Sequence, residues 1–201
     1  MKEIIIATKN QGKMVDFKKL FAPYQVEVKS LLDLGETLPD IEETGSTFEE
    51  NALLKAKGIA DILQLPVIAD DSGLEVDALG GDPGVYSARY AGLEKNDEKN
   101  LEKVLKNLQG IENDKRTARF ICVLAVVEPG KKEVLTKGIC EGRISNNPRG
   151  ENGFGYDPIF FPIGKDVTLA EMSGDEKNKI SHRRQAMHQL KDWLKTRYEE
   201  R

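Results

Sequence analysis

Residues 154–157 place two aromatic rings and a carboxylate in a run, residues 150–158, that holds three glycines and a proline. Glycine lets a backbone approach a ligand closely, and an aromatic ring offers a stacking face. The segment therefore predicts a loop, Phe154-Gly155-Tyr156-Asp157, that contacts a flat ligand. The alternative is a glycine-rich turn whose aromatic side chains fill the core.

Two adjacent carboxylates, Asp70 and Asp71, follow an apolar strand predicted at residues 67–69 and precede Ser72-Gly73. Ligand sites of α/β sheets commonly lie at the carboxyl ends of strands. Successive strand side chains point to opposite faces, so one acid would enter the site while the other caps the following turn. Two carboxylates this close need a cation or hydrogen bonds, and oxygen ligands suit Mg²⁺. An ordinary Asp-rich turn is the alternative.

A possible phosphate-binding loop joins the apolar strand predicted at residues 3–8 to a helix predicted at residues 13–21. Its sequence is Thr8-Lys9-Asn10-Gln11-Gly12-Lys13. Unpaired N–H groups and the helix dipole favour an anion at such a helix start. The run lacks the spacing of a Walker A loop, and a turn with a solvated lysine explains it equally well.

Further polar residues could complete a site, although each alone is more often a solvated side chain. Glu43 precedes a second helix and could bring a carboxylate to the same metal. Asn51 and Lys55 lie four residues apart on that helix, so both could meet a phosphate chain. Lys177 and the run Ser181-His182-Arg183-Arg184 supply a dense set of donors, whereas His188 has no motif around it.

Periodicity and capping residues predict an α/β sandwich whose sheet is partly antiparallel. Ser46 and Thr47 cap the second helix through Glu49 and Glu50. The remaining expected elements are a helix at 97–108 capped by Gly110, a hairpin of strands 119–127 and 133–144, a strand at 159–161, and one long helix that begins near Ser173 and carries Ile180, Met187, Leu190 and Leu194.

Composition predicts one soluble domain over residues 1–201. The net charge of −4 argues against bulk binding to nucleic acid but allows a local basic pocket. No apolar run is long enough for a signal peptide or a membrane span, so we expect a cytoplasmic protein. Cys122 and Cys140 could lie opposite one another on the hairpin, and two buried reduced thiols are the favoured interpretation.

Taken together, these segments resemble the inosine triphosphate pyrophosphatase family, which hydrolyses the non-canonical purine nucleotides ITP, dITP and XTP. The resemblance covers nearly the whole chain. Asp16 departs from it, because this family is expected to have glutamate there. The matching segments are Thr8 to Lys13, Glu43-Thr44-Gly45, Thr47-Phe48, Glu50-Asn51-Ala52, Ala69 to Leu74, Gly84, Ser87 to Tyr90, Gly153 to Asp157, and Ile180 to Arg183.

The resemblance implies an elongated two-lobed mixed-sheet sandwich with flanking helices, commonly a homodimer. A cleft between the lobes would hold Mg²⁺, for which Mn²⁺ could substitute, and the nucleotide. Asp71 is implied as the catalytic acid-base, with Glu43 and Asp71 at the metal. The implied substrate contacts are Thr8, Lys9, Asn10, Gln11, Gly12, Lys13, Lys55, Ser72, Phe154, Gly155, Tyr156, Asp157, Lys177, His182 and Arg183.

The implied reaction converts a nucleoside triphosphate and water into the monophosphate and pyrophosphate, removing nucleotides that would otherwise enter DNA and RNA. Asp71 or a metal-bound hydroxide would take the proton of water. Arg183 can only donate hydrogen bonds, so it would favour purines with O6 over adenine. Two rivals stay open: another Mg²⁺-dependent phosphohydrolase using Asp70 and Asp71, and a non-catalytic nucleotide sensor.

Overall fold

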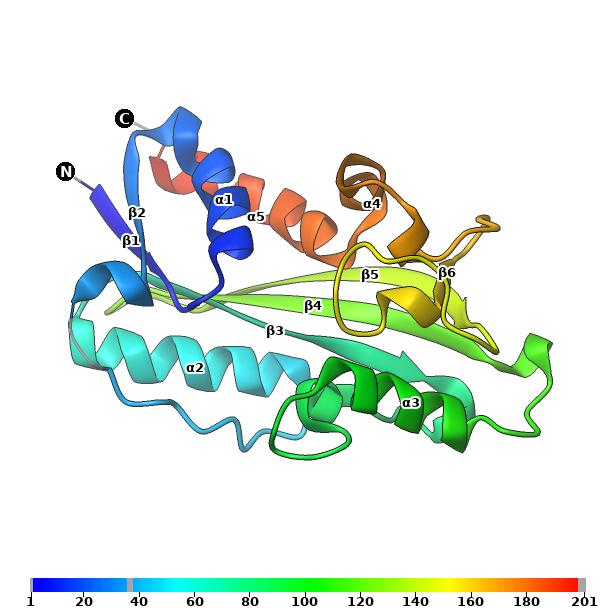
Figure 1. Cartoon of the computed structure of the whole chain (residues 1–201). Helices are drawn as coiled ribbons and strands as arrows, with labels where there is room; N and C mark the ends of the chain where they lie inside the picture. The colour runs from blue at the N-terminus through cyan, green and yellow to red at the C-terminus, as the bar shows by residue number, and fades with distance from the viewer. Residues whose placement is uncertain (1, 36–37, 199–201) are drawn as a thin grey trace. The chain divides into compact units, whose positions relative to one another are not determined.

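The computed structural model describes residues 2–35 and 38–198. Its strands form one sheet in the order β2-β1-β3-β4-β5-β6. β1 is parallel to β2 and β3, whereas β5 and β6 are antiparallel, so the sheet is mixed (Figure 1). The strands are β1 (Lys2–Ile6), β2 (Val26–Ser30), β3 (Val67–Val76), β4 (Thr117–Val127), β5 (Val134–Ile144) and β6 (Phe160–Pro162). The α-helices are α1 (Gln11–Phe21), α2 (Phe48–Leu63), α3 (Asp97–Asn107), α4 (Gly174–Ile180) and α5 (His182–Tyr198). This mixed α/β architecture confirms the predicted fold class.

The chain folds into two compact units, and each is built from segments that lie far apart in the sequence. Unit 1 comprises residues 1–71, 123–137 and 186–201, and unit 2 comprises residues 72–122 and 138–185. A single domain over residues 1–201 stays a prediction. Within the part of the chain that the structure describes, no helix has both the length and the apolar character to cross a membrane.

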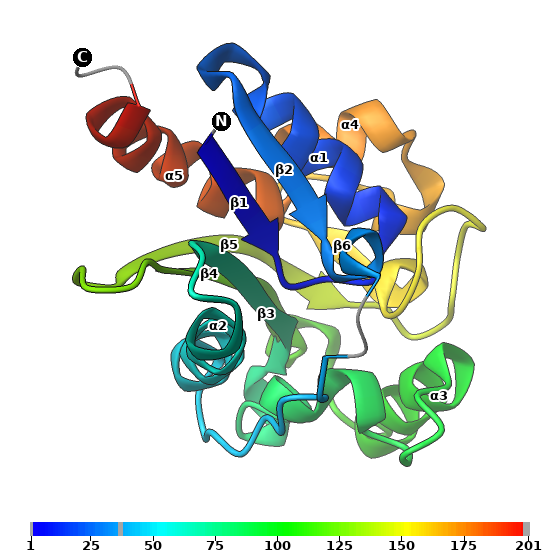
Figure 2. The same ribbon diagram turned by 90° about the vertical axis from the view of Figure 1, so that its left-hand side faces the viewer.

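Unit 1 places helices on both faces of its part of the sheet. α1 lies on one face and α2 on the other, with β1 and β2 side by side (Figure 2). The apolar run Ile4–Ile6 of β1 is fully buried, as expected for a strand covered on both faces. α1 buries Met14, Phe17 and Phe21, which recur at the spacing of one helix face. These contacts confirm the strand and helix predicted on either side of residues 8–13.

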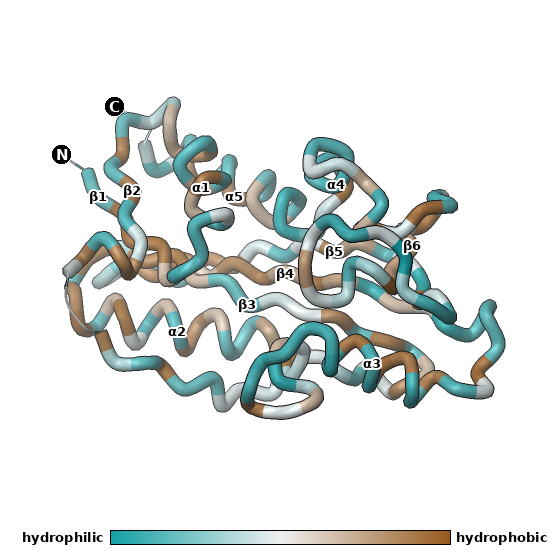
Figure 3. The backbone as a smooth tube through the Cα atoms, viewed as in Figure 1, coloured by the Kyte–Doolittle hydropathy of each residue, from teal (hydrophilic) through white to brown (hydrophobic). Residues whose placement is uncertain are grey.

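Unit 2 has its own apolar core. Val104 of α3, Phe120 of β4 and Ile159 belong to one cluster of buried side chains. The tube in Figure 3 shows hydrophobic residues concentrated in the central strands and hydrophilic residues in the loops. α3 covers one face of the sheet in this unit and α4 lies on the other (Figure 1). This core supports the loop at residues 150–158.

Several predicted element boundaries are wrong: for example, β1 ends at Ile6 rather than Thr8, and α1 begins at Gln11 rather than Lys13. β3 does not end at residue 69 but continues through Asp70, Asp71, Ser72 and Gly73 to Val76. Residues that favour turns locally are held in the strand by pairing with neighbouring strands. Consequently neither acid caps a turn. In addition, Leu108 rather than Gly110 is the C-cap of α3.

The long helix predicted from Ser173 is in fact two helices. Ser173 and Glu176 form the predicted capping box at the start of α4. The backbone of Ser181 is extended, with φ −67° and ψ 143°, so the helix stops there. The Ser181 hydroxyl then accepts a hydrogen bond from the Arg184 N–H at 3.2 Å. Ser181 is therefore a second N-cap, and α5 begins at His182.

The hairpin and both thiols are as predicted. β4 and β5 are neighbours joined by residues 128–133, a connection short enough only for antiparallel strands. Cys122 and Cys140 are both buried, and neither forms part of a disulfide. Burial raises the pKa of the Cys140 thiol to about 11.

Candidate active site

The start of α1 offers backbone N–H groups in the arrangement predicted for an anion. Asn10 is the N-cap, and its side-chain Oδ1 accepts a hydrogen bond from the Lys13 N–H at 3.1 Å. The Thr8 hydroxyl accepts one from the Asn10 N–H, also at 3.1 Å. Gln11 and Gly12 are exposed in the first turn. Thr8 is buried, so it shapes the loop, while exposed Lys9 pairs with Asp40.

Lys13 and Lys55 meet at Asp70 on β3. The ammonium Nζ of Lys13 lies 2.7 Å from the buried carboxylate of Asp70. Lys55 Nζ lies 3.1 Å from the backbone oxygen of Asp70 and forms an ion pair with Glu43. Burial alone would lower the pKa of Lys55, but Glu43, Asp70 and Asp71 together raise it. Unit 1 thus gathers two ammonium groups and three carboxylates.

Asn51 does not serve as the predicted phosphate ligand. Its side chain is completely buried, and its Oδ1 accepts a hydrogen bond from the Gly45 N–H at 2.8 Å. A Cβ atom on Gly45 would lie 2.7 Å from that Oδ1, so glycine is needed for this contact. Asn51 therefore fixes the chain before α2, next to Glu43, rather than reaching a ligand.

The carboxylates of unit 1 fit a magnesium ion by their chemistry. The negative charges of Glu43 and Asp71 both raise the pKa of Lys55, so both lie near its ammonium group. Both also carry the hard oxygen ligands that Mg²⁺ prefers. Over residues 2–35 and 38–198, no group of three or more carboxylate, imidazole or thiol side chains is placed so that it could hold a metal ion by itself. Mg²⁺ in nucleotide sites uses one or two carboxylates and takes its other ligands from phosphate and water. The residues present fit that arrangement.

The loop at residues 153–157 in unit 2 has one exposed ring and one buried ring. The Phe154 side chain is 63% exposed, so it can offer a stacking face. Tyr156 is 5% exposed, and its hydroxyl donates a hydrogen bond to the Ser87 carbonyl at 2.7 Å. Burial raises the pKa of Tyr156. The stacking interpretation therefore fits Phe154, and the core-filling alternative fits Tyr156.

Asp157 holds the loop and Lys177 together. Its buried carboxylate accepts a hydrogen bond from the Phe154 N–H at 3.0 Å and forms an ion pair with Lys177. Lys177 Nζ lies 5.0 Å from the centre of the Phe154 ring. Gly153 is required here, because a Cβ atom would lie 2.0 Å from the Asp157 carboxylate. The Gly155 N–H donates to Asp97 of α3 at 2.9 Å, which fixes the other side of the loop.

The first turn of α5 carries His182 and Arg183. The His182 ring stacks on Phe120 of β4, with ring centres 5.1 Å apart and an interplanar angle of 13°. Phe120 fixes the plane of the imidazole and was not predicted, because nothing in the sequence separates it from the other apolar residues of β4. Ser72 lies half-buried within β3. The structure thus brings predicted residues together within each unit.

A family model described as the Ham1 family matches residues 4–193. The chain belongs to this family. The match confirms the resemblance drawn from the separate motifs, because residues 4–193 include every segment that carries it.

Similar proteins cover the same length. A dITP/XTP pyrophosphatase of Oceanobacillus iheyensis is 57% identical over 98% of this chain and 100% of its own length. One of Bacillus licheniformis is 59% identical over 94% of this chain and 96% of its own. The solved Ham1 protein of Staphylococcus aureus is 49% identical, covers 97% of this chain and 99% of its own, and superposes with a TM-score of 0.91.

Proposed function

We propose that this chain is a nucleoside-triphosphate pyrophosphatase that hydrolyses non-canonical purine nucleotides such as ITP, dITP and XTP. The products are the nucleoside monophosphate and pyrophosphate. Relatives 57% and 59% identical over nearly the whole chain are named dITP/XTP pyrophosphatases. The observation that carries the proposal in the structure is the cluster in which Lys13 and Lys55 meet at Asp70, beside Glu43 and Asp71.

The triphosphate is assigned to unit 1. The backbone N–H groups at the start of α1 and the ammonium groups of Lys13 and Lys55 can offset its negative charge. Glu43 and Asp71 would hold Mg²⁺, which when bound would neutralise charge on the departing pyrophosphate. Asp71 would orient the attacking water and accept its proton. No covalent nucleophile is needed, because water attacks the α-phosphorus directly.

The purine is assigned to residues of unit 2. The exposed ring of Phe154 offers a stacking face, and Lys177 lies beside that ring. Arg183 donates hydrogen bonds and cannot accept them, so it suits the O6 acceptor of hypoxanthine and xanthine. Adenine presents an amino donor at the same position. One mismatch of this kind typically costs about 1–3 kcal/mol, or roughly one to two decades in kcat/KM.

The role in the cell follows from this chemistry. Hydrolysis of these nucleotides would keep them out of DNA and RNA. We further propose that the protein is a homodimer, which a mass near twice 22.4 kDa in light scattering would support. A mass of one chain at micromolar concentration would reject the dimer without affecting the proposed reaction.

Pyrophosphate release with ITP, XTP, ATP and a sugar phosphate tests the function. We expect turnover of ITP and XTP, slow turnover of ATP and none of the sugar phosphate. EDTA should abolish activity, and Mg²⁺ or Mn²⁺ should restore it. Release of inorganic phosphate from the sugar phosphate would favour a different phosphohydrolase. Tight ITP binding without any hydrolysis in Mg²⁺ would favour a nucleotide sensor.

A further inference from the structure

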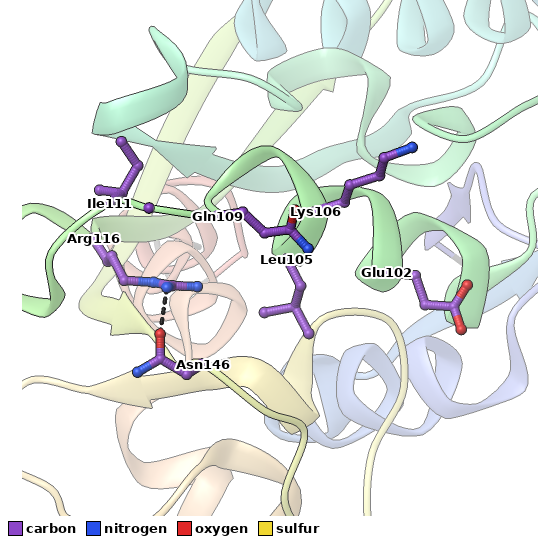
Figure 4. Close-up of a pocket in the computed structure, with 8 residues that line it drawn as sticks. Glu102, Leu105, Lys106, Gln109, Ile111, Arg116 and Asn146 are labelled. Atoms are coloured by element: carbon purple, nitrogen blue, oxygen red, sulfur yellow. Dashed lines mark hydrogen bonds between the residues drawn. The ribbon is translucent and has the colours of Figure 1, made fainter.

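A pocket of about 600 Å³ lies in unit 2 beside α3, and none of the residues assigned to the nucleotide lines it. Its apolar wall is formed by Leu105 and Ile111. Lys106 and Glu102 of α3 line the pocket on the same helix, and Arg116 and Asn146 lie together at another part of its wall (Figure 4). Small-molecule sites typically have this volume and this mixture of apolar walls with a few polar groups.

Arg116 carries a buried charge that only neutral groups contact. Its side chain is 4% exposed. One terminal nitrogen donates to the Asn146 side chain and the other to the Ser145 carbonyl at 2.9 Å. Among the described residues, its Nε finds no acceptor, and no carboxylate acts on the charge of the guanidinium. Burial lowers the pKa of Arg116, as expected for a cation without a counter-ion.

Asn146 is also fixed, which keeps Arg116 in place. Its amide nitrogen donates to the Asn113 side chain at 2.7 Å while its oxygen accepts from Arg116. Buried charges are usually paired, and an arginine with uncommitted N–H groups is well suited to a planar acid group. Lys106 adds a second positive charge at the pocket wall. The single opposing charge among the lining residues is Glu102.

We infer that this pocket is a second ligand site, for a small organic carboxylate. The acid group would face Arg116, Lys106 would add positive potential elsewhere on the pocket wall, and an apolar body would lie against Leu105 and Ile111. Inorganic anions share the charge but lack the apolar body, so they should bind more weakly. The inference does not depend on the proposed hydrolysis of nucleotides, because the pocket and the nucleotide residues are different.

The test is a titration of the full-length ¹⁵N-labelled protein with benzoate, benzamide and inorganic phosphate, followed by amide chemical shifts. Benzoate should produce saturable shifts at Gly110, Ile111 and Asn146. Benzamide has nearly the same shape without the charge and should produce none. Phosphate should move the same signals with a larger dissociation constant. Equal shifts with benzoate and benzamide, or equal affinity for phosphate and benzoate, would overturn the inference.

Four variants make the charge argument quantitative. Arg116→Gln should raise the benzoate dissociation constant about fivefold or more, Lys106→Gln should raise it by about twofold, and Glu102→Gln should lower it. Lys115→Gln is the matched control, because Lys115 precedes Arg116, pairs with Glu112 and does not line the pocket. Lys106 and Glu102 are exposed, so Lys106→Gln and Glu102→Gln still test the charge dependence of benzoate binding if Arg116→Gln does not fold. Unchanged benzoate affinity in both Lys106→Gln and Glu102→Gln would reject the carboxylate site.

Discussion

Each lysine proposed to contact the nucleotide already has a carboxylate partner. Lys13 pairs with Asp70, Lys55 with Glu43, and Lys177 with Asp157. These pairs hold the ammonium groups in position before substrate arrives, which lowers the entropy cost of binding. They also leave little excess positive charge to attract a polyanion. A cation bound with the substrate would remove that deficit, which is a physical reason to expect dependence on Mg²⁺.

Asp71→Asn should reduce kcat for ITP by roughly two to four decades, the range typical of a lost general base. The amide keeps the size of the side chain but removes its charge and basicity. Asp61→Asn is the control, because Asp61 is an exposed aspartate on α2 and should leave kcat unchanged. Steady-state pyrophosphate release measures both. Near-normal turnover by Asp71→Asn, with a normal far-UV spectrum, would remove Asp71 from the mechanism.

Arg183→Ala should lower kcat/KM for ITP far more than for ATP, because only ITP presents an acceptor at O6. Lys13→Ala should weaken both substrates about equally, since both carry the same triphosphate. The ratio of the two kcat/KM values separates base selection from phosphate binding. If Arg183→Ala lowers both in the same proportion, Arg183 contacts phosphate or supports the fold, and base selection belongs to His182 and the loop around Phe154.

At the scale of elements, the break between α4 and α5 determines where the donor residues lie. A continuous helix would carry Lys177, His182 and Arg183 around one axis with a fixed rotation of about 100° per residue. The extended backbone of Ser181 interrupts that rotation and starts a new first turn. In that turn the His182 ring stacks on Phe120. The cap therefore positions two residues that we propose contact the nucleotide.

Ser181→Ala should lower the free energy of unfolding by about 0.5–2 kcal/mol, the usual cost of losing an N-cap. It should also raise KM for ITP, because His182 and Arg183 lose their fixed first turn. Ser181→Asn is the matched control, because asparagine keeps a side-chain acceptor for the Arg184 N–H and is itself a good N-cap. Urea denaturation and steady-state kinetics compare the two variants. An equal change of KM in Ser181→Ala and Ser181→Asn would mean that the capping hydrogen bond does not position His182 and Arg183.

The sequence predicts these elements well where a local signal determines them. The periodic apolar residues of α1 and the caps Thr47 and Ser173 agree with the structure, because such signals act within a few residues. β3 was predicted too short, because pairing between strands overrides the turn preference of Asp70 to Gly73. Serine favours helix N-caps, so Ser181 was a local signal for the break between α4 and α5. The apolar pattern of one continuous helix, from Ile180 to Leu194, competed with that signal.

The candidate site was predictable in its residue types but not in its partners. The sequence indicated Asp70, Asp71, Lys13 and Lys55 as charged groups near a ligand. Lys13 contacts Asp70, which lies 57 residues away in the sequence, rather than solvent. This contact depends on the arrangement of β3 and α1. The stacking of His182 on Phe120 is likewise a contact between distant segments. Contacts of this kind have no counterpart in local patterns.

At the scale of the whole molecule, unit 1 depends on a segment that lies far from the rest of it in the sequence. α5 buries Met187, Leu190 and Leu194. Near its end, Arg197 contacts both carboxylate oxygens of Glu128 at the turn between β4 and β5. Lys2 of β1 lies 4.8 Å from the centre of the Tyr198 ring. α5 therefore joins both other segments of unit 1.

Leu194→Ala should lower the free energy of unfolding by about 2–5 kcal/mol, because Leu194 is fully buried and the substitution leaves a cavity. Ile62→Ala is the control: Ile62 is a large apolar residue on α2 that is 49% exposed, so its loss should cost much less. Chemical denaturation measures both values. Equal effects of the two substitutions would show that packing of α5 contributes little to the stability of unit 1.

The discontinuous make-up of unit 1 has a consequence during synthesis. The apolar residues Ile4–Ile6 of β1 leave the ribosome long before α5, which follows the other described helices and strands in the sequence. At typical translation rates the interval between them is roughly ten to forty seconds. Throughout that time the growing chain lacks a segment that unit 1 needs. The nascent protein is therefore a candidate client for chaperones that shield apolar strands, and a ribosome that stalls before α5 would release an aggregation-prone fragment.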